Sequence, residues 1–149
     1  MISQQQSKLS SNEISMDEES LPALYSLQLV VRADGLLVPV DRLTVNDELP
    51  SPEGKTKVVS IQGELCKEWV EAFFSNRKSL IVTASHRFVA ANGRAITAGE
   101  LTIGVKLQGD PNEVEVDGLV RIRTQGKGVF LETAPKALYY IQGVLSCGS

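Results

Sequence analysis

Histidine and cysteine are scarce in this chain of 149 residues, which has one histidine and two cysteines. Cys66 and Cys147 cannot build a disulfide framework, and their separation fits no Cys-x-x-Cys metal motif. A single histidine beside two isolated cysteines does not make up a structural zinc site. The sequence therefore predicts neither a metal site nor a cofactor.

Long apolar runs and basic clusters are missing as well. No stretch approaches the ~18 apolar residues that a membrane helix needs, so we expect no membrane segment. The formal net charge is -3, and Lys and Arg form no cluster with interleaved aromatic residues, which argues against a nucleic-acid partner. Residues 1–20 contain no apolar core of a signal peptide. We expect a monomer, located in the cytoplasm if this chain is expressed alone.

Bulky apolar residues are sparse in residues 1–20, which are rich in Ser and Gln and then acidic. Such a segment cannot bury enough apolar surface to offset the entropy lost on ordering, so we predict a flexible, disordered leader. The density of apolar residues rises at Leu21 and stays high. We therefore place one folded domain at residues 21–149, a length that can bury a sizeable core.

Short runs of aliphatic and β-branched residues fill this domain, and turn residues interrupt them roughly every 8–12 positions. Asp34-Gly35 and Asn92-Gly93 separate such runs and predict two hairpins, the second with a type I′ turn. Residues 40–45 and 97–101 are long enough for single helical turns only. We predict an all-β fold with strands near residues 27–31, 36–40, 57–61, 69–74, 79–83, 88–90, 94–96, 114–116, 119–123, 129–133, 138–141 and 144–146.

The one histidine, His86, ends the motif Thr83-Ala84-Ser85-His86, directly after the apolar run at residues 80–82. Histidine is the side chain whose unperturbed pKa lies near neutrality, so acid–base chemistry at pH 7 usually needs one. The end of a strand would hold the His86 imidazole and the Thr83 hydroxyl in fixed positions. Taken alone, four such residues more often contain a half-buried structural histidine than a catalytic one.

Four blocks in order resemble the Hint domains, the self-processing domains of Hedgehog proteins and inteins. Residues 39–55 (PVDRLTVNDELPSPEGK) are similar to the family segment I-x-x-L-x-x-G-D-x-V-x-x-x-D-G, and residues 98–107 (AGELTIGVKL) to its second copy, A-x-E-L-x-x-G-D-x-L. Residues 83–86 stand in the place of the T-x-x-H block, and residues 143–147 (GVLSC) are similar to the end of a Hedgehog-type domain. The resemblance covers residues 21–147 and implies a horseshoe-like β fold with pseudo-twofold symmetry.

The resemblance also implies a reaction. A Hint domain uses a nucleophile at its first position to attack the preceding peptide carbonyl, in an N-to-S or N-to-O acyl shift. By this resemblance Thr83 would position and polarise the scissile peptide, and His86 would protonate the leaving amine. The partner would be the flanking polypeptide of the chain itself, cut once in an autoproteolytic event.

One departure from the family concerns the nucleophile. Residues 28–35 (QLVVRADG) align with the family pattern T-x-V-x-T-x-D-G, which puts the nucleophile position at Ala23. Alanine has no nucleophilic atom, so the first-position cysteine of the family is lacking. Ser26 is the nearest hydroxyl, but its use requires the alignment to slip by three residues.

Two further departures concern the C-terminal residues and the carboxylate that activates the incoming nucleophile. The chain ends in SCGS and lacks the His-Asn pair that ends an intein, which excludes full protein splicing and favours the Hedgehog branch. The carboxylate that activates the incoming nucleophile in that branch aligns with Gln62, and Glu64 is the alternative.

Two functions remain in competition. In the first, the chain is a Hint-type autoprocessing domain, impaired as written, that rearranges the peptide bond at its N-terminal junction. In the second, it is a catalytically degenerate Hint-like fold that serves as a protein-binding or structural module. An unrelated β-barrel with a chance T-x-x-H motif is a third interpretation.

Overall fold

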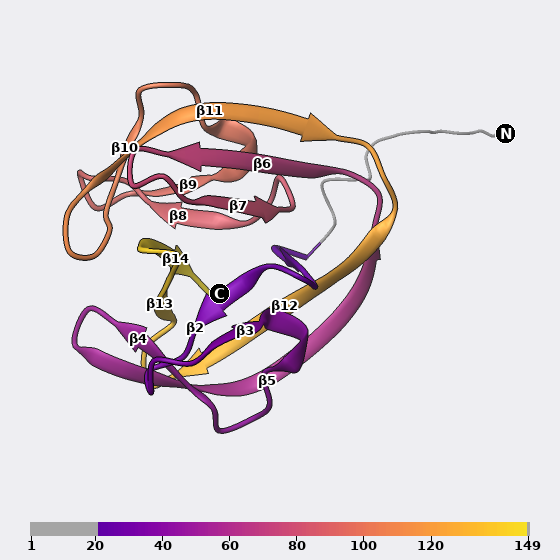
Figure 1. Ribbon diagram of the computed structural model, residues 1–149, viewed down its shortest axis with the longest axis vertical. Coiled ribbons are helices and arrows are strands. Elements are labelled where there is room, and N and C mark those ends of the chain that lie inside the picture. Colours follow the sequence, from indigo (N-terminus) through magenta and orange to yellow (C-terminus); the bar gives the residue numbers. More distant parts are fainter. Residues whose placement is uncertain (1–20, 149) are drawn as a thin grey trace, which may run out of the picture.

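The computed structural model describes residues 21–148, and these residues form strands joined by turns and short 3-10 segments (Figure 1). The predicted leader, residues 1–20, lies outside the described residues. Most of the domain belongs to one sheet of eight antiparallel strands. Their spatial order is β10 (Lys106–Leu107), β11 (Val114–Ile122), β6 (Trp69–Phe74), β7 (Ser79–Val82), β1 (Leu24–Tyr25), β12 (Gly126–Ala134), β5 (Gly54–Cys66) and β4 (Glu48–Ser51).

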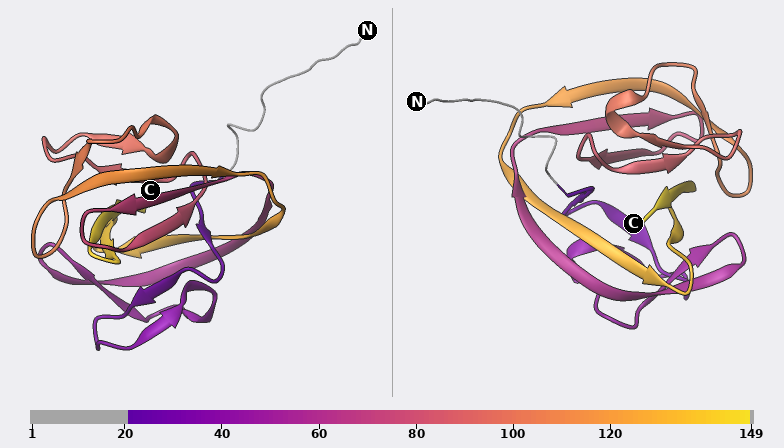
Figure 2. Two further views of the ribbon diagram at one scale, coloured as in Figure 1. Left: turned by 45° about the horizontal axis from the view of Figure 1, so that its top comes forward. Right: turned by 180° about the vertical axis from the view of Figure 1, so that it is seen from behind.

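Two smaller sheets complete the domain. One has four strands in the order β13 (Leu138–Ile141), β14 (Val144–Cys147), β8 (Arg87–Val89) and β9 (Ala95–Thr97). The other contains only β2 (Leu29–Val31) and β3 (Leu37–Pro39). The long strands β5, β12, β6 and β11 bend into a horseshoe outline, and β13 and β14 lie between its two arms in Figure 1 and in the rear view of Figure 2.

The two arms repeat the same backbone hydrogen bonds. Val40 N–H donates to the Gln28 carbonyl, and Ala98 N–H donates to the His86 carbonyl, both at 2.8 Å. The two donors differ in residue number by the same amount as the two acceptors. The 3-10 segments η2 (Val40–Arg42) and η3 (Ala98–Glu100), which begin at these donors, are therefore counterparts, and they coincide with the two predicted helical turns.

The same offset relates the strands of the main sheet. It pairs β4 with β10, β5 with β11, β6 with β12 and β1 with β7, so the strand order reads the same from either end. Leu24 and Val82 are counterparts, and they are also direct partners across β1 and β7. The pseudo-twofold axis therefore passes between β1 and β7, and the predicted pseudo-symmetric all-β fold is confirmed.

Both predicted hairpins are present, as β2–β3 and β8–β9. The predicted type I′ turn is wrong, because that turn needs positive φ at both central residues and only Gly93, at 91°, has it. The sequence did not predict β1, β4 or β10, which are two to four residues long and depend on pairing with distant strands. Strand β5 extends far beyond the predicted 57–61, because the turn-like Gln62-Gly63-Glu64 pairs with β12.

The core fills the space between the sheets with aliphatic side chains from both arms, together with Phe74, Phe88 and Tyr139. Burial of this apolar surface is the main stabilising term of the domain. Within residues 21–148 there is no helix of the length and apolarity needed to cross a membrane.

Along β5 and β12, side chains point in turn into the core and towards solvent, and this difference allows a test of the core. Leu131 on β12 is 1% exposed, whereas Leu65 on β5 is 62% exposed. We expect Leu131→Ala to lower the free energy of unfolding by about 2–5 kcal/mol through lost burial and a residual cavity. The matched change Leu65→Ala should alter it by less than about 0.5 kcal/mol. Urea unfolding followed by Trp69 fluorescence measures both, and equal losses would contradict the assigned faces.

Candidate functional site

Thr83 follows β7 and binds the chain segment that enters β1. Its Oγ1 accepts the Ala23 N–H at 2.9 Å and donates to the Leu21 carbonyl at 3.0 Å. Its backbone N–H donates to the Ala23 carbonyl at 2.9 Å. Ala23 and Thr83 are 1% and 2% exposed, so little water competes for these bonds. Thr83 therefore binds the N–H of the Pro22–Ala23 peptide group and the carbonyls of Leu21 and Ala23 on either side of it in the chain.

His86 lies one turn beyond Thr83, and its backbone N–H donates to the Thr83 carbonyl at 3.1 Å. The imidazole is 1% exposed. Its Nε2 is 3.0 Å from Oγ of Ser146, a residue of β14 that is itself fully buried. The ring meets Phe88 edge-on, with centroids 4.9 Å apart and an interplanar angle of 69°. The ring orientation is thus fixed by one hydrogen bond and one aromatic contact.

Burial lowers the pKa of His86 from 6.5 to about 3, and the nearby positive charge of Arg87 adds to this effect. At pH 7 the imidazole is therefore neutral and carries one N–H and one bare nitrogen. Such a ring can donate one hydrogen bond and accept another, but it carries no positive charge at pH 7.

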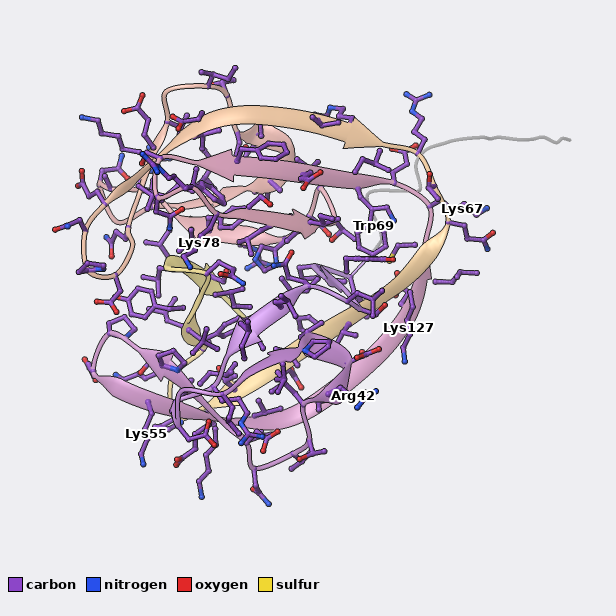
Figure 3. The ribbon with its side chains drawn as sticks, in the orientation of Figure 1. Arg42, Lys55, Lys67, Trp69, Lys78 and Lys127 are labelled. Atoms are coloured by element: carbon purple, nitrogen blue, oxygen red, sulfur yellow. The ribbon has the colours of Figure 1, made fainter. Side chains whose placement is uncertain are left out.

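The side chain of Ala23 packs with Cys66 and Trp69 at the closed end of the horseshoe, on the inner side of the bend, whereas Lys67 and Lys127 point away from it (Figure 3). Gly128 lies opposite. A Cβ at Gly128 would be 2.8 Å from Cys66 Sγ and 2.9 Å from Ala23 Cβ, so this close approach requires glycine.

The Cys66 thiol therefore lies beside the position from which a Hint nucleophile would attack. Burial raises the pKa of this thiol, and the neighbouring charge of Glu64 raises it further. Cys66 is thus a protonated thiol at pH 7 and a weak nucleophile.

A carboxylate also reaches the junction. The Leu21 N–H lies 3.4 Å from Glu64 Oε2. Gln62, the position favoured by the alignment, is exposed and lies opposite Phe130 in the β5–β12 ladder. The structure thus brings Glu64, and not Gln62, to the entering chain.

Ser26 lies just beyond β1, three residues after the junction. Its N–H donates to the Lys127 carbonyl at 3.0 Å, and its carbonyl accepts the Asp41 N–H at 3.1 Å. Among the hydrogen bonds of residues 21–148, none joins Ser26 to Thr83 or His86. Thr83 is therefore hydrogen-bonded to the backbone of both Ala23 and His86, and in this part of the chain Ser26 is bonded to neither Thr83 nor His86.

Two residues of this region went unnoticed in the sequence. Ser146 is the one polar side chain in the apolar strand β14, and that was the available signal. Gln28 is 9% exposed, accepts the Ile81 N–H through Oε1 at 2.9 Å and donates to the Ser79 carbonyl through Nε2 at 3.4 Å.

The pseudo-twofold offset relates these contacts of Gln28 to those of Thr83. It converts Leu21 and Ala23 into Ser79 and Ile81, so Gln28 binds on one arm the two backbone groups that Thr83 binds on the other. In the described part of the chain β2 pairs with β3 alone, and a groove of about 310 Å³ lies beside Gln28, with Lys78 in its lining. Only the Thr83 side is completed by a histidine and by β14.

No protein-family model and no curated protein matches this sequence. Solved structures do match. A bacterial intein-like domain from Clostridium thermocellum has a TM-score of 0.77 at 18% identity, with 86% of this chain and 99% of that chain covered. The gp41-1 intein has a TM-score of 0.76 at 18% identity, with 86% and 99% covered. A DnaB intein from Synechocystis sp. PCC 6803 has a TM-score of 0.74 at 15% identity, with 86% and 99% covered.

The chain therefore has the Hint-type fold, as the sequence predicted. At these identities the likeness concerns the fold alone. The three structures are inteins or an intein-like domain, so a closer relation to the Hedgehog branch stays a prediction.

The lowered pKa of His86 makes a prediction about pH. The unfolded chain takes up a proton on this residue near its ordinary pKa of 6.5, whereas the folded chain takes it up only near 3. Stability is therefore full above pH 6.5 and falls as the pH drops towards 3, by about 1.4 kcal/mol per pH unit. Because His86 is the one histidine, this loss should vanish in His86→Gln.

Urea unfolding at a series of pH values between about 7.5 and 5.5 measures the effect, since most carboxylates titrate at lower pH. The quantity compared is the change in unfolding free energy with pH, and not its absolute value, because His86→Gln also changes packing. Equal pH dependence in the two proteins would show that His86 is not buried in its neutral form.

Proposed function

We propose that this chain is a Hint-type processing domain that binds its N-terminal junction in the processing site and leaves the peptide bond between Pro22 and Ala23 intact. The observation that carries the proposal is the bond from Ala23 N–H to Thr83 Oγ1 at 2.9 Å, made between buried groups at the position where a Hint domain cleaves.

The bond stays intact because no attacking atom is available. Ala23 has only a methyl group, and Ser26 makes no hydrogen bond to Thr83 or His86 within the described residues. Cys66 is near, but its raised pKa keeps it protonated. The site thus retains binding and lacks the nucleophile, which favours a degenerate Hint module over a working autoprocessing domain.

The module acts on the polypeptide that precedes residue 23. Residues 24 and 25 form β1 between β7 and β12, and the Leu21 carbonyl is held by Thr83. Leu21 is therefore bound by Thr83 as well as joined to the domain through the chain. We infer that the module retains the polypeptide that precedes residue 23 and does not release it.

A restored nucleophile tests the proposal. In Ala23→Cys the introduced sulfur adds to the Pro22 carbonyl carbon, the C–N bond to residue 23 breaks, and the thiol proton ends on the freed nitrogen. The product is a thioester isomer of the same mass. Added dithiothreitol then exchanges with the thioester, and two fragments separate, one beginning at residue 23.

We expect the purified wild-type chain to keep its intact mass in dithiothreitol at pH 7, and Ala23→Cys to be cleaved between residues 22 and 23. Mass spectrometry of the intact protein measures both. Cleavage should fall by on the order of 100-fold when His86→Ala is added, because a fixed hydrogen-bond donor to the departing nitrogen is lost. Thr83→Val, which keeps the shape and removes the hydroxyl, should also slow it.

Cys66 needs a control because its sulfur lies beside the position of the new thiol. A disulfide between the two would block attack, so the assay is run under reduction and repeated with Cys66→Ala added. A folded Ala23→Cys protein that stays intact in both backgrounds would overturn the proposal. Cleavage that is insensitive to both Thr83→Val and His86→Ala would overturn it as well.

A further inference from the structure

The two arms of the domain provide an internal comparison for the role of His86. Thr83 and Gln28 bind equivalent backbone groups, yet the strand held by Gln28 is an ordinary internal strand of the sheet. The counterpart of His86 is Gln28 itself. What one arm has and the other lacks is an imidazole, with β14 packed beside it on the edge of β8.

Strand β14 fixes the Ser146 side chain from two directions. Ser146 pairs with Phe88 of β8 on one side and with Tyr139 of β13 on the other. Phe88 is also the residue whose ring packs edge-on against His86. The hydroxyl that meets Nε2 at 3.0 Å is therefore held by the strand pairing that also holds the aromatic neighbour of the imidazole.

We propose that Ser146 is a positioning residue for His86: its hydroxyl donates to Nε2 and thereby keeps the ring proton on Nδ1. In this proposal Nε2 is occupied by the Ser146 hydroxyl, which leaves Nδ1–H as the ring donor for the junction. The hydrogen bond made by one ring nitrogen decides which nitrogen carries the proton. In the processing reaction, which rests on the proposed function, Nδ1–H donates a hydrogen bond to the nitrogen of residue 23 as its lone pair forms.

This assignment makes the N-terminal site depend on the C-terminal strand. Ser146 is 60 residues from His86 in sequence and reaches it only when β14 is paired with β8. The junction site is thus complete only after the last strand of the described domain has docked. Once a nucleophile is restored by Ala23→Cys, processing is thereby restricted to the fully folded domain.

The tautomer is tested in the unaltered Ala23 background, so this test does not depend on any cleavage. The variants are Ser146→Ala and the matched pair Ser146→Thr and Ser146→Val, which have the same shape and differ in the hydroxyl. Nitrogen-15 NMR of the single imidazole reports which ring nitrogen carries the proton. We expect Nδ1–H in the wild type and in Ser146→Thr, and a shift of the proton towards Nε2 in Ser146→Ala and Ser146→Val.

The consequence for processing is tested in the Ala23→Cys background. Ser146→Val and Ser146→Ala should slow thiol-induced cleavage on the order of tenfold, and Ser146→Thr should restore most of the rate. Amide NMR spectra identify the variants that fold. If Ser146→Thr and Ser146→Val do not fold, the cleavage rate of Ser146→Ala is compared with that of the protein with Ser146 unchanged.

The two proposals fail in different ways. An unchanged tautomer in Ser146→Val or Ser146→Ala overturns the role of Ser146, whatever Ala23→Cys does. Equal cleavage rates in Ser146→Thr and Ser146→Val overturn it as well. Absence of cleavage in folded Ala23→Cys, with and without Cys66→Ala, overturns the proposed function, and the tautomer result still decides the assignment of Ser146.

Discussion

The rest of the structure depends on the way a strand of two residues, β1, is held between β7 and β12. So short a strand has little stability of its own, because most of its backbone groups must find partners in other elements. Thr83 supplies them at one end, through its hydroxyl and its N–H. The main sheet is continuous across the pseudo-twofold axis only while β1 is in place. Binding of the entering chain is therefore part of the fold itself.

The repeated clamp separates docking from chemistry. Gln28 binds Ser79 and Ile81 much as Thr83 binds Leu21 and Ala23. Ser79 and Ile81 belong to β7, which is an ordinary internal strand of the main sheet. The hydroxyl of Thr83 is accordingly a docking group, and reactivity must come from what is not repeated. Alanine at residue 23 is compatible with docking, because its methyl group fits the narrow space that Gly128 leaves open.

Local signals in the sequence were sufficient for part of this structure. Asp34-Gly35 and Asn92-Gly93 mark hairpins, since glycine there adopts the positive φ that each turn needs. Thr83 and His86 share one turn, so their association could also be predicted. Ser146 could not, because its contact with His86 depends on strand pairing over long range. The choice between Gln62 and Glu64 likewise depends on where β5 meets the entering chain, which alignment by residue counting does not reveal.

The burial that keeps His86 neutral also limits the chemistry this site can support. A ring with a pKa of about 3 has no positive charge to give to a leaving group at pH 7, and its contribution is a directed hydrogen bond. Most of the acceleration must then come from placing the attacking atom and the carbonyl carbon in contact. Under the proposed function, alanine at residue 23 offers no attacking atom for that contact. A fold that supplies position and little proton transfer would then keep its full binding geometry without the reaction.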